Sequence, residues 1–184
     1  MDKEECPETC QYKHTPLVIS EGFGSYERAI LFIANRGDER VLQPALFGNE
    51  HEQALLEVDS GRSLGQILKH CGIKLKDIKF TNILKCLIPQ TEKIPDGAYR
   101  SCESRLKTQI ENLNPKVIVT FGEPCLMYMF PDIYDGSFMN KVGNVYDYHN
   151  RPVLIEHHLS KIYRLKKPNE AERIKRFLIQ QKAI

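Results

Sequence analysis

The sequence predicts an α/β fold in which a parallel sheet lies between layers of helices. Short apolar runs rich in β-branched residues alternate with longer segments whose apolar residues recur at helical spacing. Most of these runs are almost continuously apolar, which is typical of strands buried on both faces. There is no internal repeat or low-complexity linker, and 184 residues suit one domain, so we expect a single domain over residues 1–184.

Four apolar runs are the expected strands, at residues 29–34, 78–84, 116–121 and 152–156. Each is followed by a helical pattern. These patterns cover residues 63–71, 95–113, 124–130 and the stretch from 168 onward. Gly72 is a plausible cap for the first helix, and Pro115 stops the second. Strands that alternate with helices in this way form parallel sheets covered on both faces.

Composition excludes several classes of protein. With 41% hydrophobic residues and a net charge of +2, the chain is too apolar and too balanced in charge to be disordered. No apolar run approaches the roughly 20 residues that span a bilayer, so we expect no membrane contact. The acidic start, Met1 to Glu5, lacks a hydrophobic stretch, which argues against a secretory signal and favours an intracellular protein.

Charge is distributed unevenly along the chain. Residues 1–60 carry a net charge of −7, residues 61–160 carry +3, and residues 161–184 carry +6. Such asymmetry can mark a face that meets a polyanion. The alternative is a solvated, lysine-rich terminal helix, which the charge pattern alone favours.

Polar residues stand where the predicted strands end. In sheets of this kind, ligands bind outside the carboxyl ends of the strands. That rule selects four segments as the candidate site, at residues 35–38, 82–86, 122–124 and 157–158. The first and last are the richest in groups that can take part in chemistry.

Six cysteines in an intracellular chain indicate metal or thiol chemistry before disulfides. Four of them are spaced as a close pair plus two distant residues, a pattern that can converge on zinc or on an iron–sulfur cluster. These four are Cys6, Cys10, Cys86 and Cys102. Cys71 ends a predicted helix and Cys125 begins one, and we expect both to be small buried residues.

The segment Thr81-Asn-Ile-Leu-Lys-Cys86, followed by a proline-bearing loop and Cys102, resembles the centre of the family 4 uracil-DNA glycosylases. That family has T-N-[IV]-[VIL]-K-C, a proline-bearing loop and a helix with the next cluster cysteine. Residues 115–122 resemble its next strand. His158-Leu-Ser160 resembles its H-P-[SA] motif.

The resemblance implies a three-layer α/β/α fold with a four-stranded parallel sheet, an N-terminal iron–sulfur loop and a basic C-terminal helix. It implies a 4Fe-4S cluster held by the four cysteines named above, with zinc as the alternative. The implied partner is DNA, single- or double-stranded, that contains a deaminated base. A monomer in the cytoplasm, associated with the nucleoid, is the corresponding expectation.

The resemblance also implies roles at the active site. Asn82 would read the edge of a base taken out of the stack, because an amide offers both a donor and an acceptor; the alternative is that it caps a buried strand. His158 would stabilise negative charge on the leaving base, and His157 would point to the opposite face; both could instead be satisfied by neighbours. Asn35 would orient the attacking water, or else shape a turn.

Contacts to DNA follow from the same resemblance. Phe47 would stack on the base, although a place in the core is equally consistent with the sequence. Lys85, Lys161 and Arg164 would contact phosphates, the alternative being ordinary surface charge.

The first motif departs from the family pattern. Where the family has G-E-x-P-G, this chain has Ala34-Asn-Arg-Gly-Asp38, so Asn35 stands in place of the acid and the proline is absent. Related mismatch-specific glycosylases use an asparagine there, and Asp38 and Glu39 are possible substitutes. Leu56 is an alternative to Phe47 in register. Leu159 also replaces a proline.

Three functions follow from these patterns. The first is a DNA repair glycosylase that hydrolyses the N-glycosidic bond of uracil or another deaminated base. The second is an iron–sulfur, DNA-binding member of the same superfamily that has weak or no catalysis, which the altered first motif favours. The third is a zinc-stabilised nucleotide-binding protein with no glycosylase ancestry.

Overall fold

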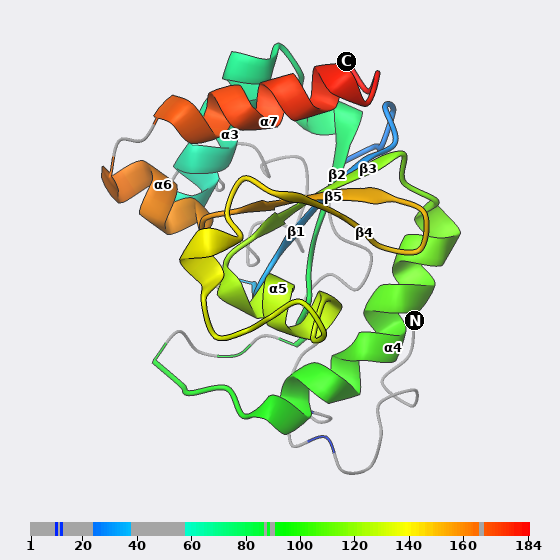
Figure 1. Ribbon diagram of the computed structural model, residues 1–184, viewed down its shortest axis with the longest axis vertical. Helices are drawn as coiled ribbons and strands as arrows, with labels where there is room; N and C mark the ends of the chain where they lie inside the picture. Colours follow the sequence, from blue (N-terminus) through cyan, green and yellow to red (C-terminus); the bar gives the residue numbers. More distant parts are fainter. Residues whose placement is uncertain are drawn as a thin grey trace, which may run out of the picture.

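A central five-stranded sheet organises the protein (Figure 1). The computed structural model describes residues 10, 12, 24–37, 58–86, 88, 91–165 and 168–184. The strands are β1 (Ile30–Ala34), β2 (Ile78–Asn82), β3 (Val117–Phe121), β4 (Val145–Asp147) and β5 (Pro152–Glu156). Their order across the sheet is β2-β1-β3-β5-β4. The first four in that order are parallel, as predicted, and β4 is antiparallel to β5.

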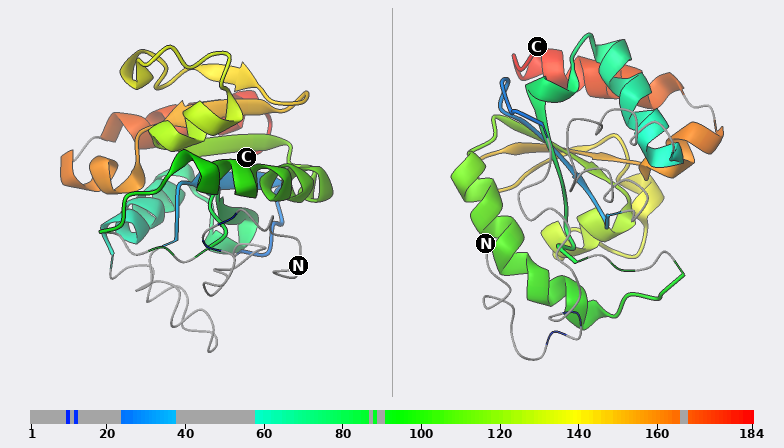
Figure 2. Two further views of the ribbon diagram at one scale, coloured as in Figure 1. Left: turned by 90° about the horizontal axis from the view of Figure 1, so that it is seen from below. Right: turned by 180° about the vertical axis from the view of Figure 1, so that it is seen from behind.

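Helices cover both faces of the sheet (Figures 1 and 2). One face carries α3 (Asp59–Cys71), α6 (Leu159–Leu165) and α7 (Pro168–Gln180). The other carries α4 (Asp96–Leu113) and α5 (Glu123–Met129). Two 3-10 turns complete the described elements, η2 (Leu75–Asp77) and η3 (Phe138–Asn140). The α/β/α layering predicted from the sequence is therefore confirmed.

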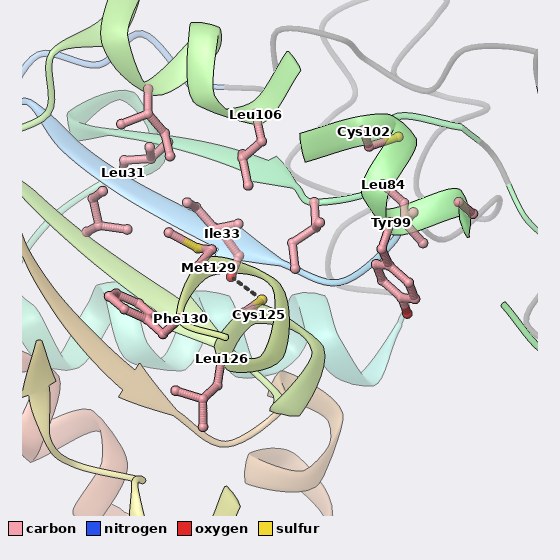
Figure 3. Close-up of a cluster of buried hydrophobic side chains, with 14 of the residues drawn as sticks. Leu31, Ile33, Leu84, Tyr99, Cys102, Leu106, Cys125, Leu126, Met129 and Phe130 are labelled. Carbon is pink, nitrogen blue, oxygen red and sulfur yellow. Dashed lines mark hydrogen bonds between the residues drawn. The ribbon is translucent and has the colours of Figure 1, made fainter. Parts of the chain in front are cut away.

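Alternate residues of each strand enter opposite cores, because side chains alternate across a sheet. Along β1, Ile30 and Phe32 belong to the cluster packed under α3, α6 and α7. Leu31 and Ile33 belong to the cluster packed under α4 and α5, part of which Figure 3 shows. All four side chains are completely buried, which accounts for the uninterrupted apolar run in the sequence.

Helix ends follow the signals expected from the sequence. Gly72 follows α3 in the left-handed conformation, with φ of 70°, and its N–H reaches the carbonyls of Leu68 and Lys69. Pro95 precedes the first residue of α4, and Asn114 ends that helix with φ of 44°. Because α4 ends at a defined residue, the start of β3 a few residues later is defined as well.

Strand β4 and helix α6 were not predicted. Strand β4 is three residues long and largely exposed, so its sequence carries no apolar run. Helix α6 starts directly after His158 and has only seven residues, too few for a helical period to stand out. Among the helices that the structure describes, none is long and apolar enough to cross a membrane.

Candidate active site at the carboxyl edge of the sheet

Two asparagines lie side by side where β1 and β2 end. Ala34 is paired in register with Asn82, and Asn35 is the next residue after β1. Hydrogen bonds continue past the strand ends, from the Ile83 N–H to the Ala34 carbonyl at 2.8 Å and from the Leu84 N–H to the Asn35 carbonyl at 3.0 Å. The sheet therefore holds Asn35 and Asn82 at the same edge, as the sequence predicted.

Asn35 is anchored by a tyrosine that the sequence analysis did not select. The hydroxyl of Tyr99, on α4, donates a hydrogen bond of 2.9 Å to Asn35 Oδ1. Tyr99 is only 7% exposed, and burial is the main cause that raises the pKa of its hydroxyl. Its ring stacks on Tyr128 of α5 with centroids 4.1 Å apart. Figure 3 shows Tyr99 at the end of the cluster that contains Cys102 and Leu84.

The backbone of Asn82 is held by a hydrogen bond from a buried side chain, whereas its own side chain is only half-buried. The carbonyl of Asn82 accepts a hydrogen bond from Lys85 Nζ at 2.6 Å. Its side-chain amide is half-buried and forms no hydrogen bond with the rest of the described chain. The interpretation that Asn82 reads the edge of a base stays a prediction.

His158 is exposed at the end of β5, whereas His157 is buried, as strand alternation predicts. The Nδ1 atom of His158 lies 2.8 Å from Ser160 Oγ and accepts the Ser160 backbone N–H at 3.3 Å. Because Nδ1 is the acceptor, the neutral ring carries its proton on Nε2. In that tautomer, Nε2 is the hydrogen-bond donor of the His158 ring.

Gly122, directly after β3, allows His158 to lie close to the backbone. Its φ of 97° is in the left-handed region, and a Cβ atom there would lie 3.3 Å from His158 Cδ2. The Gly122 N–H donates to the Glu156 carbonyl at 2.9 Å, which ties the ends of β3 and β5 together.

Glu156 and His157 belong to a buried polar cluster behind His158. The Glu156 side chain is fully buried and accepts two hydrogen bonds from Arg173 of α7, at 2.9 and 2.7 Å. Burial raises the pKa of Glu156, and the Arg173 guanidinium opposes that rise. Glu170, also buried, lies 3.9 Å from His157 Nε2 and 3.8 Å from Arg173 Nη2. The cluster fixes α7 to the strand that carries His158.

The prediction that Lys85 contacts DNA phosphates is wrong. Its side chain is 1% exposed, and Nζ lies between Thr81 Oγ1, the Asn82 carbonyl and Gln109 Oε1, at 2.9, 2.6 and 2.6 Å. Burial lowers the pKa of the ammonium to about 7. The physical reason is position: Lys85 follows β2 and turns back under α4, where it supplies the three donors that these oxygens need.

Three cysteines of the predicted ligand set share one environment. Cys10, Cys86 and Cys102 are buried and belong to the same apolar cluster under α4. Cys86 Sγ lies 3.6 Å from the Tyr12 carbonyl. Cys6 falls outside the described residues, and those that are described form no group of three His, Cys, Asp or Glu able to hold a metal ion. The thiol donors are thus of the right chemistry and burial for a cluster, but the described residues alone do not complete a site.

The loop between the cysteines is held against the first motif. The Tyr12 hydroxyl donates to the Glu92 carboxylate at 2.6 Å, and Arg36 Nη1 donates to the Glu92 carbonyl at 3.0 Å. Arg36 follows Asn35 directly, so the cysteine-bearing region and the end of β1 form one connected unit.

Cys71 and Cys125 are buried core residues, as predicted. Burial raises the pKa of the Cys71 thiol to about 11 and that of the Cys125 thiol to about 12. Cys125 Sγ lies 3.6 Å from the Ile33 carbonyl, the contact drawn in Figure 3.

The other predicted residues divide into two groups. Lys161, in α6, is partly exposed, and its Nζ contacts Met139 Sδ at 3.7 Å. Four other residues lie outside the described part of the chain, namely Asp38, Glu39, Phe47 and its alternative Leu56. For Arg164 the structure describes the backbone but not the side chain.

Comparison with known families decides the ancestry of this site. The family model of the uracil DNA glycosylase superfamily matches residues 32–179, which cover all five strands except the first two residues of β1. The chain belongs to the uracil DNA glycosylase superfamily. The third function, a nucleotide-binding protein with no glycosylase ancestry, is therefore wrong.

Relatives within the superfamily are proteins named Type-4 uracil-DNA glycosylase. The one from Thermotoga maritima is 31% identical over 116 residues, which are 62% of this chain and 59% of that protein. The one from Archaeoglobus fulgidus is 30% identical over 91 residues, 48% of this chain and 45% of that protein. The one from Saccharolobus solfataricus is 30% identical over 84 residues, 46% and 37% of the two chains. The matches thus span about half the length of these relatives.

Proposed function

We propose that this protein is a DNA repair glycosylase that hydrolyses the N-glycosidic bond of uracil or another deaminated base. The observation that carries the proposal is the placement of Asn35, Asn82 and His158 at the carboxyl edge of one parallel sheet, in a member of the uracil DNA glycosylase superfamily. That edge is where open α/β sheets bind their ligands.

The chemistry begins with a base rotated out of the stack into a pocket. The Asn82 amide offers a donor and an acceptor, which match O4 and N3–H of uracil. Lys85 Nζ donates to the Asn82 backbone carbonyl and so holds the point of the chain from which the amide extends. Phe47 would stack on the base ring, as the resemblance implies.

His158 would stabilise the leaving group. When the bond between the base and C1′ breaks, the electron pair goes to the base, and negative charge develops on O2. A neutral imidazole with its proton on Nε2 donates a hydrogen bond to that oxygen without adding a positive charge that must be desolvated. The two Ser160 contacts to Nδ1 favour this tautomer.

Phosphate contacts would come from the segment after His158. Lys161 lies three residues beyond His158 and is partly exposed, and Arg164 is one turn further along α6. Cationic side chains at that place would hold the strand beside the flipped nucleotide. The basic balance of residues 161–184 supports the same surface.

A glycosylase assay tests the proposal. Oligonucleotides carrying uracil, hypoxanthine or xanthine, single- and double-stranded, are incubated with the protein and probed for abasic sites by alkaline cleavage. We expect release of at least one of these bases, and a loss of about 100-fold or more in Asn82→Ala. Asn112→Ala is the matched control, because Asn112 is exposed near the far end of α4. Failure to release any base would contradict the proposal.

We propose that Cys6, Cys10, Cys86 and Cys102 hold a 4Fe-4S cluster. Three of them are buried in one apolar cluster, and thiolates in such surroundings suit iron–sulfur ligation. When bound, the cluster would hold the segment between Cys86 and Cys102 in shape. Anaerobically purified protein should be brown and contain about four irons per chain, and Cys102→Ser should be depleted of iron. Colourless protein with stoichiometric zinc would identify the alternative metal.

A second function is favoured by one observation. Asn35 stands where the resembled family has an acid, and its amide oxygen already accepts a hydrogen bond from Tyr99. A protein without a carboxylate at this position, to act as a general base, could bind damaged DNA and release no nucleobase. Tight, salt-dependent DNA binding together with no release from the whole panel would identify this silent member of the superfamily.

A further inference from the structure

We infer that Tyr99 is a positioning residue for Asn35, and that it holds the amide by its oxygen so that Asn35 meets the attacking water as a hydrogen-bond donor. The inference rests on the proposed glycosylase function and deepens it. It concerns the step in which water adds to C1′ of the sugar, and it depends on a contact between residues 64 positions apart in the chain.

Tyr99 is built to hold one orientation. Its ring is buried in the core under α4 and stacks on Tyr128 with an angle of 12° between the ring planes. A ring fixed on its faces leaves the hydroxyl little freedom, so the 2.9 Å hydrogen bond to Asn35 Oδ1 is geometrically defined. Asn35 itself is held through its backbone carbonyl, which accepts the Leu84 N–H.

The contact determines which part of the amide is left for the reaction. With Oδ1 engaged by the hydroxyl, the Nδ2 group provides the donors that Asn35 can offer to a ligand. The hydroxyl also polarises the amide, which strengthens Nδ2–H as a donor. Within the described part of the chain, Nδ2 makes no hydrogen bond, so it can bind water.

The chemical consequence is a water that is held but not deprotonated by residue 35. Nδ2–H donates to one lone pair of the water, and the other lone pair forms the new bond to C1′. The bond from C1′ to the base breaks, its electron pair leaves with the base, and the water proton passes to bulk solvent. In such a reaction, the bond between C1′ and the base must be largely broken before the water adds. Its rate should therefore show no acidic limb from a carboxyl group at position 35.

Four variants test the role of the hydroxyl. Tyr99→Phe removes only the hydroxyl, and Tyr128→Phe is the matched control, because that hydroxyl donates to Asp96 and the ring stack is kept. We expect Tyr99→Phe to lower kcat about tenfold with KM changed less than about twofold. Tyr128→Phe should leave both unchanged.

Asn35→Ala and the double variant Tyr99→Phe/Asn35→Ala complete a cycle. If Tyr99 acts through Asn35, the loss caused by Tyr99→Phe should disappear in the Asn35→Ala background. A loss that persists there would overturn the inference, and so would unchanged kcat in Tyr99→Phe alone. A purely structural role would lower the unfolding free energy while leaving kcat unchanged.

A second measurement does not depend on activity. In protein labelled with ¹⁵N at asparagine, the two side-chain amide signals of Asn35 are identified by their loss in Asn35→Ala. Tyr99→Phe should shift them, and Tyr128→Phe should not. If the protein releases no base, the proposed function fails while these shifts still test the contact. Unshifted Asn35 signals in Tyr99→Phe would overturn the inference whatever the activity.

Discussion

Removing one partner of the buried ion pair between Glu156 and Arg173 should strongly destabilise the protein. The Glu156 side chain is fully buried, and Arg173 Nε and Nη2 donate to its two oxygens at 2.9 and 2.7 Å. Arg173→Met keeps much of the side-chain volume but leaves a buried carboxylate without its cation. Breaking a buried pair by removing one partner costs about 3–5 kcal/mol. We expect a loss of that size in the free energy of unfolding.

Urea denaturation followed by far-ultraviolet circular dichroism measures this loss. Arg176→Met is the matched control on the same helix, since Arg176 is 64% exposed and lies 3.8 Å from Glu172. An exposed pair at that spacing contributes little to stability. A double variant Glu156→Gln/Arg173→Met removes the buried charge as well and should recover part of the loss. If Arg173→Met falls within about 1 kcal/mol of Arg176→Met, the reasoning is refuted.

The pH dependence of the same variant has a definite sign. Burial already raises the pKa of Glu156 in the folded protein, and Arg173 opposes that rise. Without Arg173 the folded pKa moves further above the unfolded value, so the folded variant binds a proton that the unfolded chain has released. Its stability relative to the parent protein must then fall as pH rises through that pKa, and recover toward acid. A deficit that grows toward acid would contradict this account.

Four further substitutions test the site. Gly122→Ala should lower the unfolding free energy by about 1–3 kcal/mol, because φ is 97°, and should lower the glycosylase rate by displacing His158; an unchanged urea midpoint would contradict this. Lys85→Met should leave the slope of log DNA affinity against log salt concentration unchanged, because Lys85 is buried. Lys161→Ala should reduce the magnitude of that slope by about 0.9 on duplex DNA. Equal slopes in the two variants would contradict the buried position of Lys85 and the partly exposed position of Lys161. Asn35→Asp should add an acidic limb to the pH profile of kcat, because only the ionised carboxylate accepts the proton of the water; a flat profile would show that residue 35 does not contact the water.

The layers and the parallel strands could be predicted because they are encoded locally. Buried strands read as continuous apolar runs, and the glycine after α3 and the prolines beside α4 mark helix ends within a few residues of sequence. The placement of Asn35, Asn82 and His158 at one edge followed from topology, because parallel strands end on the same side of the sheet. Strand β4 was not predicted, because an exposed three-residue edge strand has no apolar pattern.

Contacts between distant segments could not be predicted in this way. Lysine is usually a surface residue, so the sequence predicts that Lys85 is exposed. Only the packing of α4 over β2 places Gln109 beside its ammonium group. The same holds for Tyr99, whose apolar spacing on α4 indicates a core residue but says nothing of the hydroxyl. The signal that was available is its position on the inner face of the helix, one turn before Cys102.

These distant contacts have a shared consequence for catalysis. Each proposed catalytic group is held by a neighbour: Asn82 by Lys85 through its carbonyl, Asn35 by the Tyr99 hydroxyl, and the imidazole of His158 by Ser160. Lys85 and Tyr99 hold their partners from the buried side of the sheet edge, where they would not touch DNA. Because a misplaced catalytic group affects the transition state more than the bound substrate, substitution of these holders should change kcat while DNA affinity stays nearly constant. The precision of the site would then depend on the polar contacts inside the cores beneath the sheet edge.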